Sequence, residues 1–403
     1  MMPDILFLAH RIPFPPDRGD KIRSFHALKH LAGLGRVHLA CFADDEADAG
    51  HLPALREALG NRLGEAHVEV RRTGKAAAAA RALLGRRPVS LTAFDSPSLR
   101  RFVQRIAARP GLAAVFAFSG QMGQFVPAGP RFVMDFCDMD SAKFAAYAKS
   151  GPVALRWLMK REAEMLFAFE RETAARADAS LFVSEAEADL FRSRTGLADV
   201  RAMSNGIDLD FFDPDAAFPR LAAEERGLGP LLLFTGQMDY RPNIEAVTAF
   251  ARHVLPLLPG VRFAVAGRKP APQVVALRGQ GVLVTGEVAD IRSWLAAADV
   301  VVAPLGIARG IQNKVLEAMA LARPVVASPA AFEGIEAEPG RELIVAESGD
   351  DQAQAIARLL GDPKAARALG AAARVRMESS YRWDSRLAPL ERMLFPAARK
   401  AAA

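Results

Sequence analysis

The chain has 403 residues, of which 51% are hydrophobic and 24% charged, and its formal net charge is +6 at pH 7. This length predicts two domains, and the composition excludes a disordered or collagen-like chain. The two cysteines, Cys41 and Cys137, lie far apart, which argues against a disulfide scaffold or zinc site and is typical of a reducing cytoplasm. No apolar run reaches the ~18 residues that cross a bilayer.

Apolar runs alternate with amphipathic stretches along the chain. Before position 185 the predicted strands are DILFLAH, VHLACFA, AHVEVRR, AAVFAFS, RFVMDF and ASLFVS. The first of these has no basic residue ahead of it, so we interpret it as a strand rather than a secretion signal. After a turn-rich segment follow LLLFTG, VRFAVAG, GVLVTG, DVVVAP and RPVVAS. Apolar strands separated by helices predict parallel sheets covered on both faces, and the repeated pattern predicts an α/β fold of two doubly wound, Rossmann-like domains facing across a cleft.

The predicted joint between the domains lies in SNGIDLDFFDPD, which is rich in Asn, Gly, Asp and Pro. We therefore expect a first domain over residues 1–205 and a second over residues 206–380. A last helix over residues 381–403 carries an apolar stripe that starts at Trp383 and Leu387. On the residues alone, this stripe fits an ordinary last helix of the second domain.

Residues 71–109 are strongly basic, with ten Lys and Arg against one acid, Asp95, and with leucines and phenylalanines between them. This pattern predicts contact with an anionic membrane surface or with a phosphorylated acceptor. A solvated helix face explains it equally well. Nucleic acid is not expected, because no zinc module or set of stacking aromatics accompanies the charge.

Two places in the first half carry residues suited to a site. Gly19 and Asp20 follow a proline-rich loop, where Gly19 allows close backbone approach, Asp20 is a predicted N-cap, and the helix start offers N–H groups to an anion. A routine cap is the alternative. Asp135, Asp138 and Asp140 cluster at the end of RFVMDF, which is consistent with a metal, with acceptor orientation or proton removal, or, for Asp140, with a helix cap.

In the second half Gly236, Gly267 and Gly286 each end an apolar run, where a ligand can approach the backbone closely. The residues that supply positive charge near the same edge are Arg241, Arg268 and Lys269.

A helix that follows Gly310 then carries Lys314 and, one turn later, Glu317. A helix N-terminus with a lysine suits an anion, and a carboxylate one turn on can accept hydrogen bonds from ribose hydroxyls. A plain i,i+3 helix pair is the alternative. Together with the three glycines, these residues favour a diphosphate-nucleotide site.

The residues just described resemble the GT-B glycosyltransferases of the large retaining family 4, of group 1 type. The motifs that carry the resemblance are SNGIDLDFF, FTGQMDYRPN, VAGRKP, VTGEVADI and APLGIARGIQNKVLEAMALARPVVAS. The segments RIPFPPDRGDKIRSF and DFCDMDSAKF resemble a bacterial subgroup associated with exosortase (PEP-CTERM) and exopolysaccharide loci.

The resemblance implies a metal-independent hexosyltransferase without a cofactor. Its donor would be a UDP- or GDP-sugar bound mainly by the second domain. Its acceptor would be a glycan or lipid-linked sugar bound mainly by the first. The resemblance also implies that the last helix docks onto the first domain. We expect a cytoplasmic protein that is peripheral at the inner face of the membrane.

The resemblance also assigns residues. The donor-binding residues that it implies are Gly19, Gly236, Gln237, Gly267, Arg268, Val288, Arg309, Gly310, Gln312, Asn313 and Glu317. The catalytic residues that it implies are Asp138, Lys314 and Arg241. Glu317 would hold the ribose, Lys314 the diphosphate, and Val288 would lie near the base.

Three positions depart from the family pattern. Arg309 stands where many members have a glutamate, so the usual contact with a sugar hydroxyl is in doubt. Gln237 stands where many have an arginine, and Lys314 with Arg241 would supply the missing charge. The first-domain histidine common in the family has no clear equivalent, and Asp138 stands at the corresponding strand end.

Two other functions are compatible with the same residues. One is a GT-B-shaped sugar-nucleotide epimerase, which would need no acceptor. The other is a non-catalytic subunit that binds a nucleotide sugar, which the loss of the glutamate at Arg309 suggests.

Overall fold

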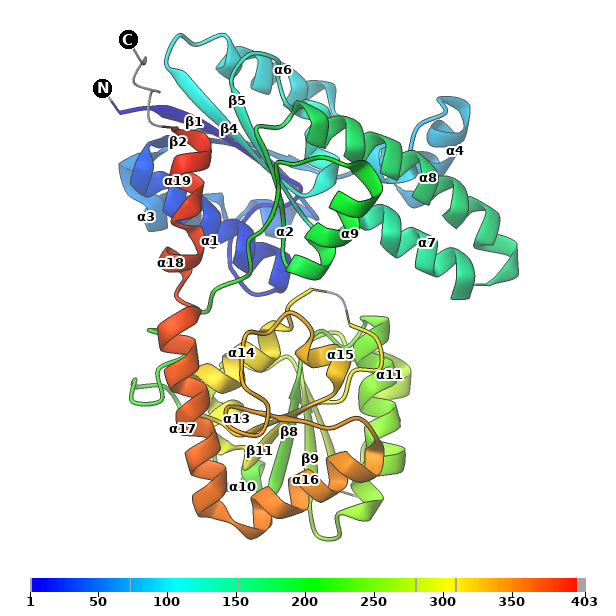
Figure 1. Ribbon diagram of the computed structural model, residues 1–403, viewed down its shortest axis with the longest axis vertical. Coiled ribbons are helices and arrows are strands. Elements are labelled where there is room, and N and C mark those ends of the chain that lie inside the picture. The colour runs from blue at the N-terminus through cyan, green and yellow to red at the C-terminus, as the bar shows by residue number, and fades with distance from the viewer. Residues whose placement is uncertain (1, 73, 151, 280, 309, 397–403) are drawn as a thin grey trace. The chain divides into compact units, whose positions relative to one another are not determined.

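The computed structural model describes residues 2–72, 74–150, 152–279, 281–308 and 310–396 (Figure 1). The chain splits into two compact units. Unit 1 comprises Met1–Ser204 and Leu387–Ala403, and unit 2 comprises Asn205–Arg386.

In the described part of unit 1, seven parallel strands form one sheet in the order β3-β2-β1-β4-β5-β6-β7. Their bounds are β1 Asp4–Ala9, β2 Arg36–Ala43, β3 Leu63–Val70, β4 Leu112–Phe118, β5 Arg131–Cys137, β6 Ala179–Phe182 and β7 Val200–Ala202. All residues of DILFLA in β1 are buried, as expected of a central parallel strand covered on both faces.

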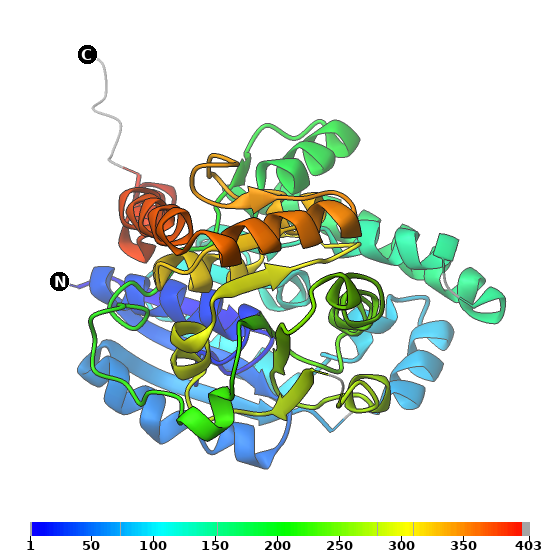
Figure 2. The same ribbon diagram turned by 90° about the horizontal axis from the view of Figure 1, so that it is seen from below.

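The helices of unit 1 connect these strands. Their bounds are α1 Gly19–Leu34, α2 Glu46–Ala49, α3 Leu52–Leu59, α4 Lys75–Leu84, α5 Val89–Thr92, α6 Pro97–Ala107, α7 Asp140–Ser150, α8 Val153–Arg176, α9 Glu185–Thr195 and α19 Pro389–Leu394, with 3-10 turns at Gly60–Arg62 and Gly120–Phe125. Helices α7 and α8 pack side by side as a hairpin that extends away from the strands (Figures 1 and 2).

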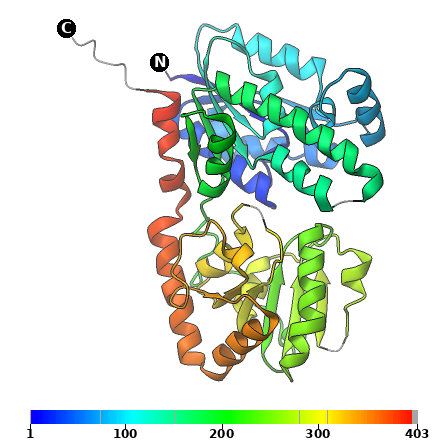
Figure 3. The ribbon, with the colours of Figure 1, turned by 45° about the vertical axis from the view of Figure 1, so that its right-hand side comes forward.

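Unit 2 has a second parallel sheet, with the strand order β10-β9-β8-β11-β12-β13. The strand bounds are β8 Leu231–Thr235, β9 Arg262–Ala266, β10 Val282–Gly286, β11 Val300–Ala303, β12 Val325–Ala327 and β13 Ile344–Val345. The helix bounds are α10 Ala223–Arg226, α11 Arg241–Ala249, α12 Pro272–Val275, α13 Ile291–Ala297, α14 Asn313–Ala320, α15 Pro329–Phe332, α16 Gly349–Gly361 and α17 Pro363–Ser380. Helices α13, α14 and α17 lie on one side of the strands and α11 on the other (Figures 1 and 3).

The predicted α/β class with two parallel sheets is confirmed. Each predicted apolar run contains a strand at the expected place, while β7 and β13 were not predicted from the sequence. Both are edge strands of two or three residues, which are too short to leave an apolar run.

The end of the chain returns to the sheet of unit 1. Helix α18 spans Trp383–Leu387, and α19 then packs against β4 and β5 with Leu390 and Leu394 buried. The Arg131 guanidinium at the start of β5 donates a hydrogen bond to the Met393 carbonyl. The closing helix is therefore held by apolar packing and by a backbone contact.

Candidate functional site

The carboxyl edge of the unit 2 sheet is built from glycines. The Gly236 N–H donates to the Ala266 carbonyl at 3.1 Å, and the Gly267 N–H donates to the Gly286 carbonyl at 2.9 Å. A Cβ on Gly267 would lie 1.6 Å from the Gly236 oxygen, and the φ angle of Gly267 is 154°. No other residue type fits there without moving the backbone, so the chain after β8 and the chain after β9 approach each other closely at Gly236 and Gly267.

Lys314 on α14 lies beside this edge. Its Nζ donates to Asn243 Oδ1 at 2.7 Å and lies 4.0 Å from the ring centroid of Phe234. The same Nζ is 3.2 Å from the place where a Cβ on Gly236 would stand. A half-buried ammonium with one carboxamide partner and an aromatic face can still donate to an anionic ligand.

Asn243, which we did not single out from the sequence, fixes this lysine. Its Oδ1 accepts from Lys314, and its Nδ2 donates to the Gln237 carbonyl at 2.9 Å. Asn243 lies in the first turn of α11, directly after the strand that ends at Gly236. The sequence signal was the asparagine of FTGQMDYRPN, which belongs to a motif that we had quoted without assigning it a role.

Burial shifts the ionisation of both charged residues on α14. It lowers the pKa of Lys314 to about 7, although the nearby Glu317 carboxylate acts in the opposite direction. It raises the pKa of Glu317 to about 7, against the effect of Lys314. An anion placed beside Lys314 would favour its charged form, so binding of a diphosphate there would take up protons near neutral pH.

The start of α14 is anchored within unit 2. Gly310 adopts a φ of 64°, and the Gln312 amide donates to its carbonyl at 3.2 Å. The Asn205 amide donates to Asn313 Oδ1 at 2.9 Å, and Glu317 lies one turn further along the helix. The structure thus brings Gly310, Gln312 and Asn313 to one helix start, while Arg309 lies outside the described residues.

The predicted arginine of α11 has a different environment. The Arg241 side chain is exposed, and its Nε donates to Glu245 Oε1 at 2.7 Å on the same helix. The Gln237 side chain donates to Asp239, and the Arg268 carbonyl accepts from the Met238 N–H. Of the two cations proposed for the diphosphate, Lys314 is the one held against the glycine edge.

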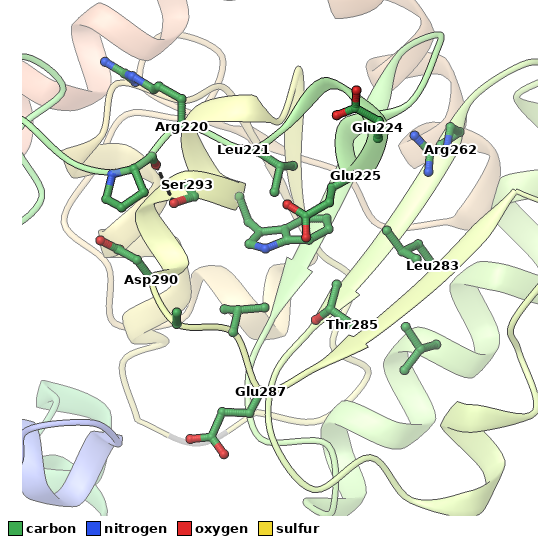
Figure 4. A pocket seen from close by; sticks show the side chains of 15 residues that line it. Arg220, Leu221, Glu224, Glu225, Arg262, Leu283, Thr285, Glu287, Asp290 and Ser293 are labelled. Carbon is green, nitrogen blue, oxygen red and sulfur yellow. Dashed lines mark hydrogen bonds between the residues drawn. The ribbon is translucent and has the colours of Figure 1, made fainter.

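A cavity of about 620 Å³ lies beside β10 and α13 (Figure 4). Trp294 and Thr285 line it together with Glu224, Glu287 and Asp290 (Figure 4). Of the predicted site residues that the structure describes, Val288 alone lines this cavity. The cavity and the lysine–glycine cluster are therefore distinct features of unit 2.

In unit 1, Asp135 has a structural partner. It is fully buried, and its two carboxylate oxygens accept from Arg23 Nε at 2.8 Å and Arg23 Nη2 at 3.1 Å. The Cys137 N–H adds a third hydrogen bond to Asp135. Asp135 is thereby committed to the fold, although in the sequence it looked like a member of one acidic cluster with Asp138 and Asp140.

Asp138 keeps one buried oxygen, Oδ1, for which the described residues provide no hydrogen-bond partner. Burial, together with the carboxylates of Glu187 and Asp140, raises its pKa to about 6. Asp140 lies at the start of α7, and its carboxylate accepts from the Gln121 amide at 3.1 Å. A carboxylate with a free acceptor and a pKa near 6 is suited to take a hydrogen bond or proton from a hydroxyl.

The prediction that Asp20 caps α1 is wrong. The helix starts at Gly19, its N-cap residue is Arg18, and no side chain caps it. Asp20 instead pairs with Arg11 at 2.7 Å and Arg18 at 2.9 Å, and with His10 at 3.2 Å. Burial by itself raises the pKa of Asp20, but the hydrogen bond with His10 and the charges of Arg11 and Arg18 hold it well below its usual range. Charge-assisted hydrogen bonds from Arg11 and Arg18 are stronger than those from the backbone N–H groups at the start of α1, so the Asp20 carboxylate pairs with the arginines.

Among the residues that the structure describes, no group of three or more His, Cys, Asp or Glu side chains could hold a metal ion. In the same described part of the chain, no helix is both long and apolar enough to cross a membrane.

Part of the second half of the chain matches a known family model. Residues 229–362 match the family model of the glycosyl transferases group 1. A phosphatidyl-myo-inositol mannosyltransferase from Propionibacterium freudenreichii is 32% identical over 158 residues, which are 38% of this chain and 39% of that protein. The chain therefore matches about two fifths of the length of that curated relative.

Solved structures resemble the whole chain. Sucrose-phosphate synthase from Thermosynechococcus elongatus has a TM-score of 0.73 at 19% identity, covering 98% of this chain and 100% of that one. The Anabaena protein HepE, solved with UDP and glucose, has a TM-score of 0.69 at 16% identity over 98% of this chain and 100% of its own. At these identities the likeness shows the fold. The protein thus has the GT-B fold, and its residues 229–362 form a glycosyl transferases group 1 domain.

Proposed function

We propose that this protein is a retaining glycosyltransferase of family 4 that moves a hexosyl group from a UDP- or GDP-sugar to a hydroxyl acceptor. The observation that carries the proposal is Lys314. Its ammonium lies 3.2 Å from the Cβ position that Gly236 lacks, at the carboxyl edge of a parallel sheet inside the group 1 domain. Ligands of such sheets bind at this edge, where the backbone is open and one cation is fixed.

The donor would bind in unit 2 through its diphosphate. Lys314 would donate to a phosphate oxygen, and the N–H groups at the start of α14, beyond Gly310, would face the same charge. Glu317, one turn further along, would accept from the ribose hydroxyls, and Val288 would lie near the base. HepE, with UDP bound in its structure, supports a nucleotide-sugar donor for a protein of this fold.

The reaction would form a bond between the acceptor oxygen and the anomeric carbon and break the bond from that carbon to the diphosphate. Negative charge then grows on the departing phosphate, where the charged form of Lys314 stabilises it. The acceptor proton would pass to a phosphate oxygen of the leaving group on the same face of the sugar. No metal is required in this scheme, because the lysine and the helix start neutralise the leaving group.

The acceptor would bind in unit 1, over residues 1–205, with Asp138 receiving a hydrogen bond from the reacting hydroxyl. Its unpartnered Oδ1 and its pKa of about 6 suit that role near neutral pH. We place the activity in exopolysaccharide or other cell-envelope glycan synthesis, from the resemblance to the exosortase-associated subgroup. The name of the phosphatidyl-myo-inositol mannosyltransferase relative supports a lipid-linked or glycan acceptor. The same resemblance to the subgroup is our reason for placing the enzyme in the cytoplasm, peripheral at the inner face of the membrane.

The deciding experiment incubates the purified chain with a panel of UDP- and GDP-sugars, with and without a membrane extract as acceptor source. We expect free nucleotide to be released only when the acceptor is present, and the new linkage to keep the anomeric configuration of the donor. Release should continue in EDTA.

Two outcomes would contradict the proposal. Conversion of one sugar nucleotide into another without acceptor would identify an epimerase. Binding of sugar nucleotides without turnover under every acceptor condition would identify a binding subunit. Activity lost in EDTA and restored by Mg²⁺ would contradict the metal-independent step alone.

A further inference from the structure

Two helical segments of unit 1 present exposed apolar side chains on the surface. At the end of α4, Leu84 is 88% exposed, and Leu83 beside it is exposed as well. At the start of α8, Val153 is 76% exposed and Trp157 67%, and Leu155 between them is exposed. Exposed tryptophan and leucine in neighbouring helices mark an interaction surface rather than the usual scatter of single apolar residues.

Hydrogen bonds hold these two segments together. The Arg161 guanidinium donates to the Ala82 carbonyl at 3.1 Å and to the Arg87 carbonyl at 3.3 Å. The Glu162 carboxylate accepts from the Val89 and Ser90 N–H groups at 2.7 and 2.8 Å. The end of α4 thus lies against α8 at Arg161.

Trp157 lies one helical turn before Arg161 and therefore on the same side of α8. Trp157 therefore lies on the side of α8 from which Arg161 reaches the end of α4. Figure 1 shows α4 beside α8, at the far side of unit 1 from β1 and β2.

The charge around these apolar side chains is mostly positive. Residues 75–94 hold four basic residues and no acid, and residues 141–161 hold five basic residues and no acid. The exposed cations nearest the apolar side chains are Arg81, Arg86, Arg156 and Lys160. We call the exposed leucines, Val153, Trp157 and these cations the basic–apolar patch.

Acidic residues near these segments already form ion pairs with basic residues. Asp95 pairs with Arg87 and Arg100 at 3.1 and 3.2 Å, and Glu164 pairs loosely with Lys160 at 3.9 Å. The other basic residues of the predicted 71–109 segment behave differently. Arg71 pairs with Asp44, and Arg105 and Arg109 both pair with Glu65. The structure therefore separates the segment into ion-paired residues and a part that adjoins α8.

We propose that the basic–apolar patch docks the protein on an anionic lipid bilayer, with Trp157, Leu84 and Val153 in the interface and the cations against the headgroups. Excess positive charge around exposed aliphatic and indole side chains matches the headgroup region of such a bilayer. Lysine and arginine residues at that surface each strengthen binding about fivefold, and the effect is screened by salt.

The position of the patch adds a consequence for the acceptor. Helix α7 begins at Asp140, two residues after Asp138, and leads into the α7–α8 hairpin that carries Trp157. A helix of its length spans roughly 16 Å. The patch would therefore hold a lipid-linked acceptor within reach of Asp138. This consequence rests on the proposed transferase function, whereas docking itself does not.

The test is flotation of the whole protein with vesicles of phosphatidylcholine alone or with phosphatidylglycerol added. We expect binding to the anionic vesicles only, reduced by high salt. The triple variant Arg81→Glu, Arg86→Glu and Lys160→Glu should bind at least ~100-fold more weakly, because three cations are lost and three acids are added. Leu228→Ala, at an exposed leucine of unit 2, is the matched control and should bind like the wild type.

Tryptophan fluorescence gives a second readout that does not depend on activity. The chain has three tryptophans, and Trp294 and Trp383 are buried, so an emission shift on adding vesicles reports mainly on Trp157. We expect a blue shift with anionic vesicles that disappears in Trp157→Phe, while that variant still floats.

Three results would overturn the proposal. They are equal flotation of the wild type and the triple variant, no flotation of the wild type with anionic vesicles, and binding to RNA without binding to vesicles. Nucleotide release from soluble acceptors should be the same in the wild type and the triple variant. A loss confined to flotation therefore separates docking from catalysis.

Discussion

The carboxyl edges of the two sheets are built in opposite ways. In unit 1, charged side chains pair with one another, as Arg23 does with Asp135 and Arg18 with Asp20. In unit 2, Gly236 and Gly267 leave the edge bare, and Lys314 stands beside it with a lowered pKa. Paired side chains fix the shape of a surface, whereas bare backbone with a single cation leaves room for a ligand to complete the site.

Within unit 1, the same contrast distinguishes Asp135, which stabilises the fold, from Asp138, for which we propose a role in function. The Arg23–Asp135 pair satisfies its own charges, so its loss should affect folding. Asp138, three residues after Asp135, has an unpartnered oxygen and a raised pKa, which is a cost to folding that a ligand hydroxyl could relieve. Three variants test whether paired and unpaired charges at these edges differ in role.

The largest effect is expected from Arg23→Met. It would leave the Asp135 carboxylate fully buried without its cation, which should lower the free energy of unfolding by about 3–5 kcal/mol. Urea denaturation followed by circular dichroism measures this. The double variant Arg23→Met with Asp135→Leu should recover most of the loss, because no charge is then left buried. A double variant as unstable as the single one would mean that packing, not charge, accounts for the loss.

Lys314→Ala comes next. Without the ammonium, the leaving phosphate loses its cation, and turnover should fall about 100- to 1,000-fold. Calorimetry should show a large loss of affinity for UDP or GDP and little change for the nucleosides. In the wild type, affinity for the diphosphates should fall as pH rises from 6 to 9, because the ammonium, with a pKa of about 7 before binding, deprotonates.

Lys364→Ala, at an exposed lysine of α17, is the matched control for Lys314→Ala. It should bind and turn over like the wild type. Equal losses of nucleoside and nucleotide binding in Lys314→Ala would remove the phosphate role of the lysine.

The smallest effect is expected from Asp138→Asn. The folded-state pKa of about 6 lies above the ordinary 3.8, so the folded protein loses stability as pH rises between these values and bears the full cost above them. The asparagine removes the charge and should raise the free energy of unfolding by about 1–3 kcal/mol at pH 8, with no gain near pH 4. Activity should fall in the same variant.

Asp210→Asn, at an exposed aspartate, controls for a general effect of removing an acid. It should show no comparable gain at pH 8. A gain for Asp138→Asn that is independent of pH would speak against a buried carboxylate as its cause.

Much of the fold could be predicted because its signal is local. Each long strand is an apolar run such as DILFLA or LLLFT, and the alternation with helices fixes a parallel sheet. The strands β7 and β13 could not be predicted, because their pairing depends on the neighbouring strand rather than on their own two or three residues. The position of a short edge strand is therefore set by the neighbouring strand with which it pairs.

In the candidate site, some residues could also be predicted from the sequence, whereas their contacts could not. Gly236, Gly267 and Lys314 could be selected from the sequence because glycines directly after strands, combined with a lysine at a helix start, are typical of an anion site at a sheet edge. Their closeness, and the place of Asn243 between Lys314 and Gln237, required the structure. Residues 71 positions apart meet only when the sheet brings their loops to one edge.

Local pattern and spacing are enough to predict the class of the fold, the strand ends where a ligand could lie, and the residue types available there. Which charges are already paired depends on the tertiary structure. It paired Asp135 with Arg23 and Asp20 with Arg18 and left an oxygen of Asp138 unpartnered. A carboxylate looks the same in every sequence, and its partners and burial, which set its pKa and its role, come from distant parts of the chain.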